Sequence, residues 1–202
     1  MLNIFNVPKI FRRFEEFDKV TKFRLQNSYL IAVTMSILAP ILVVLKGTLL
    51  LPWVVSVFAI LNTLSVKMND YIVNNYTLDQ VYKAGVLIHI TLTLGACIYF
   101  ISPMVMIYMD STLAIIETAV FSSYSLMLNN YLTDEYPNFM SSFQIVRNSS
   151  WADGALIGLL YVTVITFFFP LSTAVISFIL FNSLFGIWLL KNWDFYKDIK
   201  LS

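Results

Sequence analysis

Long apolar stretches separated by short polar segments dominate the 202-residue chain. Because about 20 apolar residues in a helix cross the ~30 Å hydrocarbon core of a bilayer, each stretch predicts a membrane span. The stretches are continuous rather than alternating, which excludes a transmembrane β-barrel. The pattern predicts an all-α polytopic membrane protein with six transmembrane helices, over residues 27–46, 48–66, 84–106, 112–131, 150–169 and 171–190. The border between the third and fourth spans stays open, because Met104–Met109 is apolar and fits either helix.

Positive charge is distributed unevenly between the two sides that these spans define. Twelve of the thirteen lysines and arginines precede the first span, follow the last or lie in the loops at 67–83 and 132–149, and only Lys46 falls on the other side. Basic residues concentrate on the cytoplasmic side of membrane proteins. We therefore expect both termini in the cytoplasm and three outward-pointing helical hairpins, with tight outer connections at Lys46–Gly47, near Asp110 and at Pro170. The expected location is a bacterial cytoplasmic (inner) membrane, in one orientation.

Residues 1–26 precede the predicted bundle at 27–190, and residues 191–202 form the expected cytoplasmic tail. In the first segment apolar residues recur every three or four positions, including Phe11 and Phe14, while Arg12, Arg13 and Lys19 take other faces. This pattern predicts an amphipathic helix in the membrane interface, with basic groups toward anionic lipid. Anchoring to the bilayer and docking to a partner are both open roles for it.

The amino-acid composition limits the partners and the kinds of site that the protein can have. Hydrophobic residues make up 58% of the chain and charged residues 12%, about half the charged fraction of a soluble domain. A net charge of +1 does not indicate a nucleic-acid partner. One histidine and one cysteine exclude a His/Cys metal cluster, and nucleotide-binding and hydrolase motifs are absent. We expect no metal, no cofactor and no enzymatic activity.

Ionisable groups within spans are the candidate functional residues, because each costs about 2.5–3.5 kcal/mol at a span centre. Counting from the predicted span ends places Asp153, His89 and Asn62 in one layer of the inner leaflet and Glu117 in the outer half. The first three form the predicted polar cluster, in which a carboxylate beside an imidazole passes a proton. The alternative is that Asp153 caps the fifth span and that His89 is a satisfied interface residue. For Glu117 a functional and a structural role are both open.

Gly154 and Gly158 form a small-xxx-small pair in the fifth span. Such a pair allows close approach of a second helix. Packing against another span of the same chain and a dimer seam are both possible, and we favour the first.

The layout resembles one half of a major facilitator superfamily transporter. The stretch LNNYLTDEYPNFMSSFQIVRNSSWADGALIG is similar to that family's segment from the fourth to the fifth helix, where an acidic–proline turn and a basic residue precede a glycine-containing helix; the matching positions are Asp134, Pro137, Arg147, Gly154 and Gly158. After the second span only Asn69–Asp70 matches the family's loop motif. Ser65 stands where its glycine would be, and the helix-4 arginine is missing. The resemblance implies a bundle of two inverted three-helix repeats, completed by a parallel homodimer.

Two functions follow as expectations. One is a small integral membrane protein that acts by contacting another membrane protein, of an immunity, exclusion or assembly type, with residues 1–22, 67–83 and 132–149 as working surfaces. The other is a half-size transporter using Asp153, His89 and Glu117. The departures from the family's motifs favour the first, and the buried ionisable residues favour the second.

Overall fold

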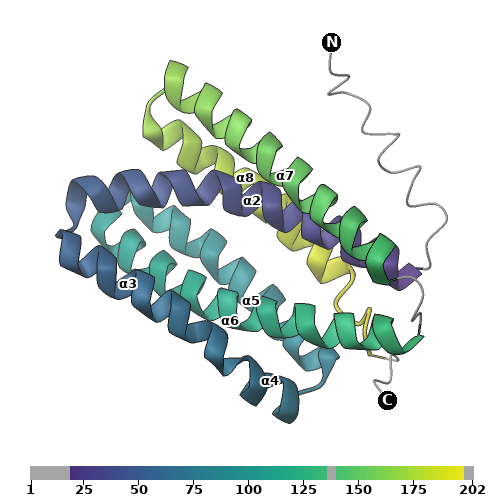
Figure 1. The fold of residues 1–202 in the computed structure, drawn as a ribbon. Coiled ribbons are helices and arrows are strands. Elements are labelled where there is room, and N and C mark those ends of the chain that lie inside the picture. Colours follow the sequence, from purple (N-terminus) through teal and green to yellow (C-terminus); the bar gives the residue numbers. More distant parts are fainter. Residues whose placement is uncertain (1–18, 136–139, 198–202) are drawn as a thin grey trace.

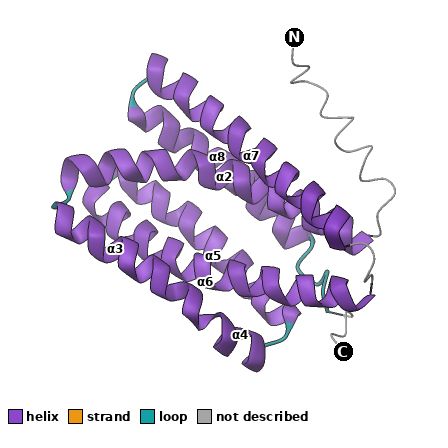
Figure 2. Ribbon diagram, in the orientation of Figure 1, coloured by secondary structure: helices purple, strands orange, loops and turns teal. Residues whose placement is uncertain are grey.

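The computed structural model describes residues 19–135 and 140–197, and these are folded almost entirely into helices (Figures 1 and 2). The all-α prediction is confirmed for these residues. The elements are α2 (Lys19–Leu49), α3 (Pro52–Ser65), η1 (Val66–Met68), α4 (Asn69–Asn75), α5 (Leu78–Cys97), η2 (Ile98–Phe100), α6 (Pro103–Glu135), α7 (Met140–Phe168) and α8 (Leu171–Lys191).

Five stretches of the described chain are helical, long and apolar enough to cross a membrane: Lys19–Leu49, Leu78–Phe100, Pro103–Thr133, Arg147–Phe168 and Leu171–Lys191. These helices indicate an integral membrane protein. The predicted second span corresponds to α3, whose 14 residues extend only about 21 Å at the α-helical rise. The helical path then continues through η1 into α4.

Several helices begin earlier than predicted. α2 starts at Lys19 and runs through the expected boundary at residue 26, because Thr21, Phe23 and Arg24 are buried within the bundle. Residues 1–18, with Phe11, Arg12, Arg13 and Phe14, lie outside the described part of the chain. Lys19 is within it, and its Nζ lies 5.4 Å from the centre of the Phe195 ring.

The connection predicted near Asp110 lies elsewhere. The chain turns at Ile98–Ser102, and Pro103 opens α6, since proline suits the first turn of a helix. Asp110 therefore sits inside α6 and is fully buried. The predicted inner loop at 67–83 is largely helical, and α5 begins at a capping box in which Thr77 and Gln80 bond each other's backbone N–H groups.

α2 and α7 pack side by side in parallel with one constant register. The Ser150 hydroxyl donates to the Leu25 carbonyl, Gly154 faces Tyr29, and Gly158 faces Val33. A Cβ at Gly154 would lie 2.5 Å from the Tyr29 carbonyl oxygen, closer than any side chain fits. The structure thus places both glycines where α7 meets another helix of the same chain.

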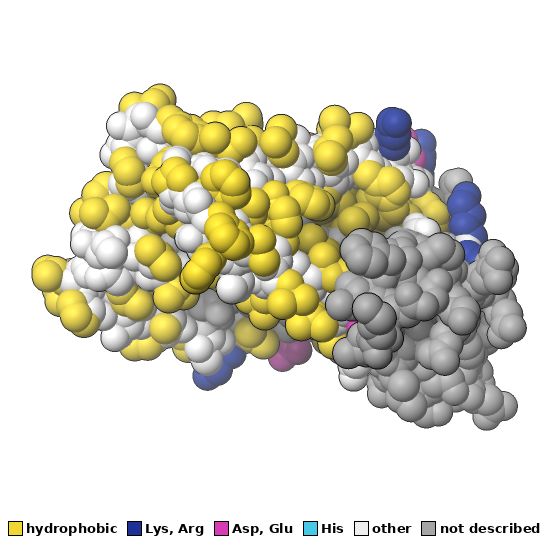
Figure 3. All heavy atoms as spheres, turned by 90° about the horizontal axis from the view of Figure 1, so that it is seen from above, with side chains coloured by type: hydrophobic (Ala, Val, Ile, Leu, Met, Phe, Trp, Pro, Cys, Tyr) yellow, Lys and Arg dark blue, Asp and Glu magenta, His cyan; other side chains and the backbone are white. Residues whose placement is uncertain are grey.

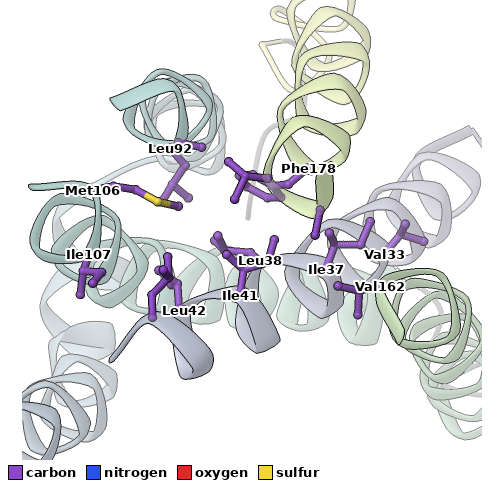
Figure 4. Close-up of a cluster of buried hydrophobic side chains, with 14 residues drawn as sticks. Val33, Ile37, Leu38, Ile41, Leu42, Leu92, Met106, Ile107, Val162 and Phe178 are labelled. Carbon is purple, nitrogen blue, oxygen red and sulfur yellow. The ribbon is translucent and has the colours of Figure 1, made fainter. Parts of the chain in front are cut away.

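α5 lies between α6 and α8 and is antiparallel to both. Gly85 faces Val120 of α6, and the Tyr82 hydroxyl donates to the Leu189 carbonyl of α8. One buried apolar cluster joins α2, α5, α6, α7 and α8, and its members include Leu38, Leu92, Met106 and Phe178 (Figure 4). A second, more aromatic cluster includes Phe23 and Tyr82.

The bundle has two distinct ends (Figure 1). The short connections at Leu50–Leu51, Ile98–Ser102 and Phe169–Pro170 all lie at the same end, which we call the turn end. The opposite basal end holds the start of α2, α4 and the end of α8. Figure 3 shows hydrophobic side chains over most of one face, with lysine and arginine side chains at its margins.

Candidate functional site

His89 of α5 and Glu117 of α6 face each other inside the bundle. Nδ1 of His89 lies 3.5 Å from Oε1 of Glu117, longer than the 2.7–3.2 Å typical of an N–H···O hydrogen bond. The residues are 2% and 8% exposed, respectively. An ionisable pair thus occupies the interior of a bundle whose surroundings are largely apolar.

Glu117 lies deeper in the bundle than the sequence predicts. A span that begins at residue 112 places Glu117 near its outer end, whereas α6 begins at Pro103, fourteen residues before Glu117. The earlier start moves Glu117 about 13 Å further along its helix than the predicted span allowed. The antiparallel pairing of α5 and α6 then brings it level with His89.

A small cavity of about 40 Å³ adjoins the pair, and both side chains line it together with Asn27 of α2. Among the described residues, Nε2 of His89, Oε2 of Glu117 and Oδ1 of Asn27 are buried without a hydrogen-bond partner. Space of this size with several polar partners suits an ordered water molecule. The pair and Asn27 therefore adjoin a space that one water molecule can fill.

α8 fixes the position of His89. The Asn182 amide donates to the His89 carbonyl at 3.2 Å and to Oγ1 of Thr93 at 2.6 Å. The Phe185 ring packs edge-on against the imidazole, with 4.6 Å between ring centres. The imidazole is thus oriented by packing on one side and left free to meet Glu117 on the other.

Among the described residues, no hydrogen bond or ion pair connects Asn62 or Asp153 with His89 or Glu117. Oδ1 of Asn62 accepts from the Thr118 hydroxyl at 3.0 Å, on an exposed face of α3 and α6. Asp153 is half-buried on α7 and follows Met140, the first residue of that helix, by thirteen positions. Because α7 begins so early, Asp153 is not in its first turn and does not cap it.

Arg24 precedes the first predicted span and is not among the predicted site residues. It is 2% exposed, and its Nη2 donates to the Ser125 hydroxyl at 2.7 Å. Its guanidinium also lies over the Phe121 and Tyr124 rings. The available signal was a polar stripe at helical spacing, formed by Thr21, Arg24, Asn27 and Ser28, all buried.

A buried pair of tyrosines lies toward the basal end of the bundle. The hydroxyls of Tyr124 and Tyr196 lie 2.6 Å apart, and burial raises the pKa of the Tyr196 phenol well above its usual value. The Tyr196 phenol is therefore a neutral partner in this hydrogen bond.

No group of three or more His, Cys, Asp or Glu side chains that could hold a metal ion occurs among the described residues. Comparison of the chain with protein families, with curated protein sequences and with solved structures found no match.

Proposed function

We propose that the protein crosses the membrane six times, as three outward hairpins with both termini in the cytoplasm. Two observations support this topology. The three short connections lie at one end of the bundle (Figure 1), and most lysines and arginines belong to the other end or its flanking segments. In this topology α3 with η1 forms the shortest crossing, and the basal end faces the cytoplasm of a bacterial cell.

As its function we propose proton-linked transport by a half-size unit of major facilitator type, which encloses its pathway as a parallel homodimer. The His89–Glu117 pair carries this proposal. Ionisable residues inside a membrane bundle are costly, and those that persist often relay protons or bind ions. Here the two side chains adjoin a cavity and leave polar atoms unpaired, which a purely structural ion pair would not require.

The geometry supports a simple proton cycle. Transfer of a proton between Oε1 of Glu117 and Nδ1 of His89 interconverts a neutral pair and an ion pair without changing net charge. Uptake of one further proton, through the cavity side where Nε2 of His89 is unpaired, makes the pair positive. A positive pair is costly in this apolar interior, so its formation would favour a rearrangement that exposes it to water.

The test uses purified protein reconstituted in liposomes that contain a pH-sensitive dye. Candidate solutes are added outside, and solute-dependent proton movement is recorded for wild type, Glu117→Gln and His89→Gln. We expect both substitutions to abolish proton movement while insertion and expression persist. Asp194→Asn, which alters an exposed carboxylate at the basal end, is the control. Full activity of both site variants in liposomes or in the native host would refute the proposal.

A second candidate function is contact with another membrane protein. The exposure of α3 favours this function. α3 packs mainly on α6, and of its own residues only Ser65 is buried. Trp53 and Ile60 are 65% and 59% exposed. Photo-crosslinking residues at these two positions should capture one defined membrane partner in native cells, whereas the same probe at Leu184 of α8, also exposed, should not.

A further inference from the structure

A second and larger cavity opens at the basal end of the bundle. Its volume is about 490 Å³, and α2, α4, α6 and α7 contribute its walls. Two arginines line it, together with serine and asparagine side chains and two aromatic rings. None of the described residues that line it is an aspartate or a glutamate. Among the described residues that line it, the two formal positive charges of the arginines therefore face no neutralising carboxylate.

Arg24 is the buried one of the two arginines. Its Nη2 donates to the Ser125 hydroxyl, while Nε and Nη1 are buried with no hydrogen-bond partner among the described residues. The ring faces of Phe121 and Tyr124 contribute cation–π contacts at 5.6 and 5.1 Å. A buried guanidinium with unpaired donors is costly, so an anion that occupied the cavity would gain strong charge-assisted hydrogen bonds.

Arg147 provides the second charge from α7. Its Nη1 and Nη2 donate to the side-chain oxygens of Asn129 and Asn148 at 3.3 and 3.4 Å, which is at the long limit for such bonds. Neither partner carries a charge. Arg147 is half-buried at the cavity, so a ligand can displace these weak contacts without breaking an ion pair.

We propose that this cavity binds a phosphate-type oxyanion between Arg24 and Arg147. Two guanidinium forks match a tetrahedral anion with up to two negative charges, whereas a single carboxylate needs only one fork. The volume exceeds that of the anion alone. The rings of Phe121 and Trp151, 6.0 Å apart between centres, line the remaining space and suit an organic group attached to the phosphate.

This site is separate from the His89–Glu117 pair, and the inference does not rest on transport. Phe121 lines both cavities, so the two sites are neighbours along α6. The phosphate can belong to a water-soluble ester or to the headgroup of an anionic lipid, because the same donors recognise both. The experiment below distinguishes these two sources.

Purified full-length protein is placed in nanodiscs of phosphatidylcholine. One arm titrates glycerol 3-phosphate by isothermal titration calorimetry. The other arm varies the fraction of phosphatidylglycerol and measures headgroup retention by native mass spectrometry. We expect saturable binding in at least one arm, weakened at least ten-fold by Arg24→Gln and by Arg147→Gln. Lys197→Gln, which changes an exposed lysine at the same end, should bind like wild type.

Binding of glycerol 3-phosphate alone would identify a soluble ester, and retention of phosphatidylglycerol alone would identify a lipid headgroup. Because Arg24→Gln removes a buried contact and can impair folding, Arg147→Gln provides the second variant on a half-buried residue. Absence of saturable binding in both arms, or binding that the Arg147 substitution leaves unchanged, would overturn the proposal.

Discussion

Gly158 of α7 lies directly against the backbone of Val33 on α2. A Cβ at this glycine would come within 2.6 Å of the Val33 carbonyl oxygen and 2.9 Å of the Ser36 Cβ. With Gly154 one turn earlier, this contact sets the distance between the two helices. The close approach depends on the absence of a side chain, since neither neighbouring group is a flexible chain end.

Gly158→Ala should therefore destabilise the protein by about 1–3 kcal/mol, the usual cost of overpacking. Unfolding in mixed micelles, followed by circular dichroism, measures the change. Gly186→Ala is the matched control, because its Cβ would lie 3.7 Å from Ile90 Cγ1, an ordinary contact. Equal stability of the two variants would contradict the tight α2–α7 seam.

The His89–Glu117 pair should behave as one energetic unit. His89→Gln and Glu117→Gln should each destabilise the fold, and the double variant should be less destabilised than their sum. A coupling of about 0.5–3 kcal/mol is typical of contacting residues. The same micelle unfolding assay measures the stability of the wild type, both single variants and the double variant. The stability changes of His89→Gln and Asp194→Asn should instead add up in the double variant. Coupling between these two substitutions would show that the cycle reports a general loss of stability rather than a contact.

Removal of one hydroxyl from the Tyr124–Tyr196 pair should cost about 1 kcal/mol, the net value of a typical hydrogen bond. The proposed variant is Tyr196→Phe, which keeps the buried ring. Its loss of stability in thermal unfolding should exceed that of Tyr71→Phe, because Tyr71 is 61% exposed. A neutral effect of Tyr196→Phe would mean that the two phenols do not bond in the folded protein.

The proposed topology predicts which positions face each side of the membrane. In a Cys97→Ser background, cysteines at Gly47 and Ile101 lie at the turn end and should react with an impermeant maleimide added to intact cells. Cysteines at Tyr76 and Lys197, at the basal end, should react only after the membrane is opened. Labelling of Tyr76→Cys from outside would contradict six crossings, because that residue follows the shortest proposed span.

Apolar run length alone predicted the all-helical fold, and the described helices cover the predicted apolar stretches, although only five of them are long and apolar enough to cross a membrane. It misplaced helix ends, because polar residues such as Thr21 and Arg24 are buried against neighbouring helices and so extend the helix beyond the apolar run. The error of nine residues at the start of α6 displaced Glu117 by about two and a half helical turns. Thus an apparently small boundary error separated two residues that are in contact.

The amino-acid sequence by itself determined that this is a helical membrane protein with few interior charges, because burial in lipid demands long apolar runs and satisfied backbone groups. Only the tertiary structure decided which ionisable residues lie close together. His89 and Glu117 come together through the antiparallel register of α5 and α6. Arg24 and Arg147 line one cavity because α2 and α7 run in parallel at a constant offset. These relationships depend on helix register across many residues, which local periodicity does not encode.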